Sequence, residues 1–173
     1  RTTARLRQCG RGPAGRAMEY QAWKTQDRRW QNSSGVRAGS GIGGLEAIVK
    51  TDQLMTETGP LRISPFFIPS ALINLISGHV SIRYEFRGPN HSVVTACSTG
   101  APAIGDAARM VALDDADVMV PGGAEAAVCR IGMAGFTAAR ALSPGTTGRP
   151  DVGSLAWDTG REGLCRGGGA GRG

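Results

Sequence analysis

The 173-residue chain has little of what several common types of site require. It contains only two histidines, His79 and His91, and its four cysteines form no CxxC pair. Structural zinc sites use closely spaced cysteines and histidines, so we expect no metal site and no cofactor. Cysteines this far apart also fit a reducing compartment better than a disulfide framework.

Long apolar runs are lacking too, and so is a basic surface outside one terminal segment. No run reaches the roughly 20 residues that a membrane span needs, so no membrane association is expected. The formal charge of +6 arises in residues 1–37, which hold nine Arg and Lys against two acidic residues. Residues 38–173 hold eleven against twelve, and no interleaved aromatic and basic residues follow, so nucleic-acid binding is not expected.

Composition divides the chain into three parts. Residues 1–37 show neither helical nor strand periodicity and are predicted to be a poorly ordered basic flank. This Arg-rich start is compatible with the remains of a transit peptide or with a non-homologous flank, and we favour the flank. Residues 38–166 are predicted to form one α/β domain, and 167–173 a glycine-rich tail unable to hold a strand.

The stretch from Gly88 to Leu113 carries the pattern of strand, sharp turn and helix. Residues 91–96 follow a Gly-Pro pair and contain two valines, which predicts a short buried strand. Ser-Thr-Gly after Cys97 favours the start of a helix. Apolar side chains then recur at helical spacing and predict a face turned to the core: Ile104, Ala108 and Val111. The pattern places Cys97 at the turn between strand and helix.

A thiol at such a turn is a candidate nucleophile. The positive end of the helix dipole and unpaired backbone N–H groups favour thiolate over thiol, and thiolate is the reactive form. A cysteine after an apolar strand is also commonly a small buried hydrophobe. Position alone leaves both interpretations open.

Residues 39–44, GSGIGG, formally match the dinucleotide fingerprint GxGxxG. The preceding strand is weak, and no acidic residue ends a second strand about 20 residues later, so nucleotide binding is disfavoured. Close backbone packing where a strand meets a helix is the alternative. The helix would begin at Leu45 and end before Gly59-Pro60.

Two segments precede the Cys97 turn. Residues 62–69 contain two prolines and predict a stiff loop tucked over the core. A helix capped by Ser70 would follow, with His79 on or near its apolar face, where a lone histidine is usually a core residue.

Two more elements follow the central helix. Residues 116–120 predict a buried strand ended by Pro121, and residues 131–142 a helix with a small-residue face. Strand, helix and strand of these lengths favour a βαβ unit with a parallel sheet.

The residues around Cys97 resemble the active-site signature of the β-ketoacyl-acyl-carrier-protein synthases, condensing enzymes of the thiolase superfamily. Gly88, Val93, residues 96–100 and Ile104 fill every position of that signature. The run SPFFIPSALINLISGHVSIRYEFRGPNHSVVTACSTG and residues 122–125 and 157–164 also look like this family. The resemblance implies a thiolase-like α/β fold, of which the chain would carry the N-terminal half.

The resemblance also implies a chemistry. Cys97 would take an acyl group from an acyl carrier protein, and malonyl-acyl carrier protein would then decarboxylate and extend it. Phe136 would line the acyl pocket, although a core phenylalanine is an equal alternative. The family's two catalytic histidines match neither His79 nor His91. A fragment without condensing activity is therefore expected.

Partners and alternatives follow from the same resemblance. Acyl carrier protein and a second copy of the chain, paired by extending the sheet, are the expected partners. A bacterial cytoplasmic location is expected, with the mitochondrion as alternative. The competing hypotheses are a non-catalytic partner or pseudogene product that dimerises with a complete synthase, an unrelated small α/β binding module, and a polyketide ketosynthase.

Overall fold

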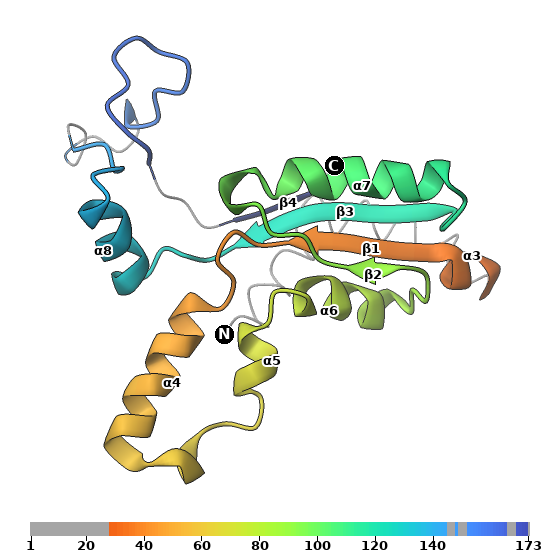
Figure 1. The fold of residues 1–173 in the computed structure, drawn as a ribbon, viewed down its shortest axis with the longest axis horizontal. Coiled ribbons are helices and arrows are strands. Elements are labelled where there is room, and N and C mark those ends of the chain that lie inside the picture. The colour runs from red at the N-terminus through yellow and green to blue at the C-terminus, as the bar shows by residue number, and fades with distance from the viewer. Residues whose placement is uncertain (1–27, 145–147, 149–151, 166–168, 173) are drawn as a thin grey trace.

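The structure, a computed structural model, describes residues 28–144, 148, 152–165 and 169–172. A mixed sheet lies at its centre, with helices on both faces and at one end (Figure 1). The helices in chain order are α3 (Arg28–Ser33), α4 (Leu45–Thr58), η1 (Pro60–Arg62), α5 (Phe67–Ala71), α6 (Leu75–Tyr84), η2 (Ala96–Ser98), α7 (Gly100–Ala112) and α8 (Arg130–Ala138). The strands are β1 (Ser34–Gly39), β2 (Asn90–His91), β3 (Val118–Glu125) and β4 (Gly169–Arg172).

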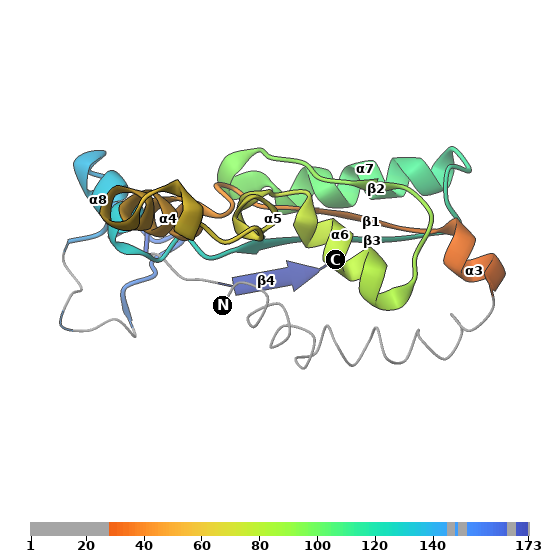
Figure 2. The same ribbon diagram turned by 90° about the horizontal axis from the view of Figure 1, so that it is seen from below.

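The sheet has the order β2-β1-β3-β4. β1 runs parallel to both β2 and β3, and β4 pairs antiparallel with β3. The parallel strands confirm the α/β prediction, with β1 between the two strands that the central helix connects. α7 and α6 lie on opposite faces of the sheet (Figure 2).

The core is small because the residues at the helix–sheet contact are small. Val36 is the largest fully buried apolar side chain, and α7 places Ala103 and Ala107 against the sheet. Alanines let the helix backbone approach the strands closely. The stripe expected to face the core is instead exposed, at Ile104, Ala108 and Val111, so the prediction chose the wrong face of α7.

The ends of the predicted domain also differ from the sequence-based boundaries. Residues 28–37, expected to be poorly ordered, form α3 and the first part of β1, while residues 1–27 lie outside the described part. The glycine-rich tail was expected to hold no strand, yet Gly169–Arg172 pair with β3. Ladder hydrogen bonds come from the backbone, so a free edge of β3 can pair a segment that lacks strand propensity.

β3 runs through Pro121, where the sequence predicted its end. Pairing with β4 begins only at Gly122, so Pro121 lies where β3 has a free edge on that side. Proline is tolerated at such a position. Conversely, the buried strand predicted over residues 91–96 is reduced to β2, and both of its residues are exposed.

The helices before β2 depart from their predicted packing. α6 buries Ser77 and Ser81, while His79 is exposed and is not a core residue. Pro69 lies inside α5 at its third position, where a helix has no acceptor for an N–H.

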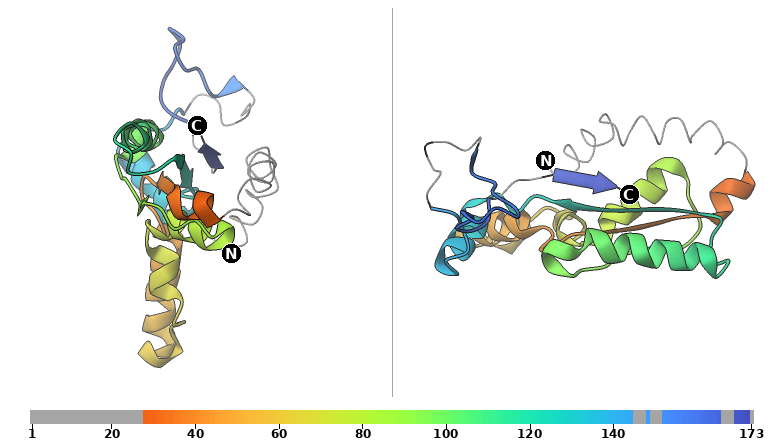
Figure 3. Two further views of the ribbon diagram at one scale, coloured as in Figure 1. Left: turned by 90° about the vertical axis from the view of Figure 1, so that its right-hand side faces the viewer. Right: turned by 90° about the horizontal axis from the view of Figure 1, so that it is seen from above.

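α4, η1 and α5 form an arm that projects from the sheet (Figures 1 and 3). α4 ends at Thr58, before Gly59 as predicted, but buries none of its residues. Residues 62–69, expected to be tucked over the core, expose Phe66 and Ile68, and Leu61 of η1 is exposed as well. The arm therefore presents apolar surface.

Candidate active site

Cys97 lies in the turn between an extended segment and the start of α7. Residues 92–95 continue from β2, η2 contains Cys97, and α7 begins at Gly100, close to the predicted helix start. Because β1, β2 and β3 are parallel, this turn lies at the carboxyl end of the sheet, where α/β proteins usually bind ligands (Figure 1). The thiol of Cys97 is exposed and free.

Side chains within the turn fix its shape. The Thr99 hydroxyl accepts the backbone N–H of Thr95 at 3.0 Å and donates to the carbonyl of Ala96 at 2.7 Å. The Ser98 hydroxyl donates to the carbonyl of Thr95 at 2.7 Å. Ala96 has φ 52°, a left-handed conformation that a non-glycine residue adopts at a cost. Thr99, with 4% of its surface exposed, closes the turn that holds Ala96 in this conformation.

The backbone N–H of Cys97 has no hydrogen-bond acceptor among the described residues. The N–H groups of Ser98 and Thr99 instead donate to Thr95 and Ala96. A donor beside an exposed thiol can stabilise the oxyanion that forms when the thiol attacks a carbonyl.

Pro102 does not disturb this arrangement. It is the third residue of α7, among the amides that have no acceptor within the helix, and the next residue, Ala103, donates to Thr99 at 3.2 Å. The kink that a proline causes deeper in a helix is not expected here.

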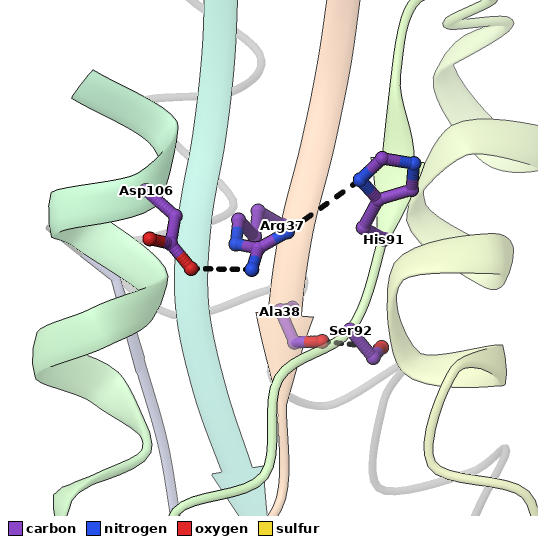
Figure 4. A network of polar contacts seen from close by, with 5 residues as sticks. All are labelled: Arg37, Ala38, His91, Ser92 and Asp106. Atoms are coloured by element: carbon purple, nitrogen blue, oxygen red, sulfur yellow. Dashed lines mark hydrogen bonds and ion pairs between the residues drawn. The ribbon is translucent and has the colours of Figure 1, made fainter. Parts of the chain in front are cut away.

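A polar network anchors the segment that leads to Cys97 (Figure 4). The Ser92 hydroxyl donates to the carbonyl of Ala38 in β1 at 2.6 Å. Arg37 of β1 forms an ion pair with Asp106 of α7, and its Nη1 lies 3.5 Å from Nδ1 of His91. The network joins β1 to α7 and to the strand before the turn.

The glycine-rich turn, residues 39–44, offers no phosphate cradle. Ile42 N–H donates to the Glu125 carboxylate at 2.8 Å, and Gly43 N–H to the Ser40 hydroxyl at 3.1 Å. Gly44 and Leu45 donate to backbone carbonyls. A carboxylate where a phosphate would sit agrees with the interpretation that this turn packs backbone closely.

The other predicted residues lie apart from the turn. Phe136 is half-buried on α8, which contacts α4 and follows the carboxyl end of β3, so it shares one end of the sheet with Cys97 (Figure 1). Cys129 is partly buried and Cys165 exposed. Cys9 lies outside the described residues. Within the described ranges, no cluster of three or more His, Cys, Asp or Glu could hold a metal ion.

Two residues of the site were missed by the sequence analysis. Thr99 was taken as part of a helix start and of the family signature, and Glu125 as part of a family turn, and neither was given a role of its own. Glu125 is the last residue of β3, and an acidic residue close to the end of a predicted strand was the available signal for it. No helix in the described part of the chain has the length and apolarity for a membrane crossing.

Comparison with known proteins gives a family for this arrangement. The profile described as "Beta-ketoacyl synthase, N-terminal domain" matches residues 13–172. The chain is 56% identical over 155 residues to 3-oxoacyl-(acyl-carrier-protein) synthase 2 of Rhizobium meliloti, covering 90% of this chain and 37% of that protein. It is 45% identical over 158 residues to the mitochondrial 3-oxoacyl-(acyl-carrier-protein) synthase of Arabidopsis thaliana, covering 91% and 34%. The chain thus spans about a third of the length of the curated relatives it matches.

Solved structures agree with the fold. A beta-ketoacyl synthase from Burkholderia phymatum superposes with a TM-score of 0.65 at 28% identity, covering 82% of this chain and 34% of that one. A ketosynthase in complex with its type II PKS acyl-carrier protein gives a TM-score of 0.76 at 21% identity, covering 82% and 36%. The thiolase-like fold is confirmed for the part that the chain contains.

Proposed function

Because the chain belongs to the β-ketoacyl synthase family and matches its N-terminal domain, we propose that Cys97 accepts the acyl group in a 3-oxoacyl-acyl-carrier-protein synthase of fatty-acid synthesis. The observation that carries the proposal is the exposed thiol in a shaped turn directly before α7. Relatives named as such synthases match across this region.

The chemistry of acyl loading follows from the turn. The Cys97 thiolate attacks the carbonyl carbon of an acyl thioester, and the carrier thiolate leaves as the new thioester forms. The N–H of Cys97 donates to the oxygen of the tetrahedral intermediate. In the condensing step, decarboxylated malonyl-carrier protein supplies the carbon that attacks this thioester and displaces the Cys97 sulfur.

Loading and condensation make different demands on the chain. The family resemblance assigns stabilisation of the malonyl enolate to two histidines that His79 and His91 do not match. His79 is exposed on α6, and His91 of β2 contacts Arg37 of β1. We therefore assign acyl loading to this chain and condensation to the whole length of such a synthase.

The acyl group and its carrier are the proposed ligands. Phe136 is the proposed contact for the fatty chain, supported by its half-buried place on α8, the helix that follows the carboxyl end of β3. Acyl carrier protein is the proposed partner, since a structural neighbour is a ketosynthase in complex with one. A second copy of the chain is the other proposed partner, and the exposed apolar face of α7 supports further association.

For location we propose the bacterial cytoplasm, because the chain is 56% identical to a bacterial protein, with the mitochondrion as alternative because the Arabidopsis relative is named as mitochondrial. The hypothesis of a non-catalytic partner is less well supported, since pairing through a sheet edge requires neither a free thiol nor a shaped turn around it.

Acyl transfer tests the proposal directly. The 173-residue chain is incubated with octanoyl-acyl carrier protein, and the adduct is located by peptide mass spectrometry. We expect one octanoyl group on Cys97, released by hydroxylamine as a thioester is, and none in Cys97→Ser. Equal octanoylation of Cys165, or no adduct on Cys97, would contradict the proposal.

A further inference from the structure

The carboxylate of Glu125 joins two segments at the carboxyl end of the sheet. Oε2 accepts the N–H of Ile42 at 2.8 Å, and Oε1 accepts the N–H of Ala126 at 2.9 Å. The first contact crosses from the end of β3 to the glycine-rich turn, 83 residues earlier in the chain. Hydrogen bonds to an ionised carboxylate are shorter and stronger than neutral ones, so this contact fixes the position of the turn.

Gly41 lies between this carboxylate and the Cys97 turn. A Cβ placed on Gly41 would lie 3.0 Å from Oε2 of Glu125 and 3.2 Å from the carbonyl oxygen of Ala96. Gly41 carries only a hydrogen at this position, so its backbone lies close to both the Glu125 carboxylate and the Ala96 carbonyl. A shift of the carboxylate would be passed through Gly41 to the Ala96 peptide.

Ala96 is the residue on which the direction of Cys97 depends. Its left-handed conformation turns the chain immediately before the thiol. Its carbonyl accepts the N–H of Thr99 at 3.2 Å and the Thr99 hydroxyl at 2.7 Å on one side, and faces Gly41 on the other. The peptide before Cys97 is thus held from within its own turn and from the glycine-rich turn.

We infer that Glu125 is a positioning residue for Cys97, acting through Ile42, Gly41 and the Ala96 peptide. The biological meaning of this inference rests on the proposed function, but the contacts that support it do not depend on that function. Both carboxylate oxygens accept backbone N–H groups, so Glu125 acts by placement and not by proton transfer. Gly41, which has no side chain, leaves room for this carboxylate and for the peptide before the thiol.

The test compares how fast iodoacetamide alkylates Cys97 and Cys165 within each molecule of the full chain. Both thiols are exposed, so their ratio cancels differences in reagent and sample. We expect the ratio to fall about tenfold in Glu125→Ala, the size expected when a hydrogen bond to a charged group is lost. Glu125→Gln keeps the shape and one acceptor oxygen and should give an intermediate ratio.

A matched control and a folding check make the result decisive. Glu57→Ala removes an exposed carboxylate on α4 and should leave the ratio unchanged. An unchanged ratio in Glu125→Ala, or an equal fall in Glu57→Ala, would overturn the inference. If circular dichroism shows Glu125→Ala unfolded, Glu125→Gln decides, with a lowered ratio in support and the wild-type ratio against.

Octanoylation of the same variants separates this inference from the proposed function. A wild-type chain that takes no octanoyl group, but whose alkylation ratio depends on Glu125, would refute the function and keep the positioning role. A chain that is octanoylated at equal rates in wild type and Glu125→Ala would keep the function and refute the positioning role.

Discussion

Single side chains decide where the thiol of Cys97 lies. Thr99 contributes to this position in two ways: its hydroxyl hydrogen-bonds to both Thr95 and Ala96, and its methyl group faces Gly39 of β1. A valine at this position would keep the volume and lose both hydrogen bonds. Thr99 therefore allows the contribution of the hydroxyl to be measured separately from packing.

Thr99→Val should lower the free energy of unfolding by about 1–3 kcal/mol, because it removes both hydrogen bonds of the Thr99 hydroxyl, with the N–H of Thr95 and with the carbonyl of Ala96. It should also slow alkylation of Cys97 relative to Cys165. Urea denaturation and peptide mass spectrometry measure the two effects. Thr99→Ser retains the hydroxyl and should restore the alkylation ratio. Wild-type behaviour of the valine variant would show that the hydroxyl does not shape the turn.

At this scale the sequence predicted the place of Cys97 but not the contacts that hold it. The residues after Cys97 signal a helix start by their type alone, and α7 begins there. The bond between Glu125 and Ile42 joins residues 83 positions apart and depends on how β1 and β3 pair, which no local pattern contains.

Among the elements, α7 contacts the sheet most closely. It packs on β1 and β3 through alanines and is tied to β1 by the ion pair of Arg37 with Asp106. Periodicity predicted the helix but chose the wrong face, because the sequence places large apolar residues on one side of α7 and small ones on the other. Close helix–sheet contact selected the small residues.

The ion pair between β1 and α7 should contribute measurably to stability. Arg37 is largely buried, with 15% of its side chain exposed, so Asp106→Ala leaves a charge with little water around it. In urea denaturation, we expect Asp106→Ala to lower the free energy of unfolding by about 1–3 kcal/mol. This is less than for a fully buried pair, because Asp106 is itself 40% exposed. Adding Arg37→Leu should recover most of this loss.

The control for this prediction is the exposed pair of Glu46 with Lys50 on α4. Lys50→Ala breaks a pair whose side chains are 52% and 60% exposed and should cost less than about 0.5 kcal/mol. Equal losses for Asp106→Ala and Lys50→Ala would show that the pair of Arg37 with Asp106 does not tie α7 to the sheet.

Glycines in two elements should respond oppositely to alanine. A Cβ at Gly105 of α7 would meet nothing within 4 Å, so Gly105→Ala should stabilise the chain by about 0.5–1 kcal/mol through helix propensity. A Cβ at Gly39 of β1 would lie 1.9 Å from the carbonyl oxygen of Val93, so Gly39→Ala should destabilise it by about 1–3 kcal/mol or more. Thermal unfolding measures both changes. Destabilisation by Gly105→Ala would mean that a neighbour covers this position.

For the whole molecule, apolar surface remains exposed on two sides. The outer face of α7 exposes Ile104 and Val111, and the arm of α4, η1 and α5 exposes Leu61 and Phe66. Contiguous exposed apolar surface usually marks an interface. The sequence indicated an α/β domain and a helix with a strong apolar stripe, but an amphipathic pattern does not state whether its partner lies within the described chain.

The exposed face of α7 should therefore affect association more than folding. The double variant Ile104→Gln and Val111→Gln should change the free energy of unfolding by less than about 0.5 kcal/mol, since both residues lie outside the core. It should also reduce self-association in sedimentation velocity. A large loss of stability would place these residues in a core contact and contradict the fold as described.

The proposed function requires that the turn around Cys97, and not exposure alone, makes its thiol reactive. The most direct measurement is the rate at which iodoacetamide alkylates each cysteine of the unmodified chain at neutral pH, followed by peptide mass spectrometry. Because Cys97 and Cys165 are both exposed, we predict that Cys97 reacts about ten times faster than Cys165 or more, and that octanoyl-acyl carrier protein protects Cys97 alone. Equal rates at the two cysteines, with no protection of Cys97, would contradict the proposed function.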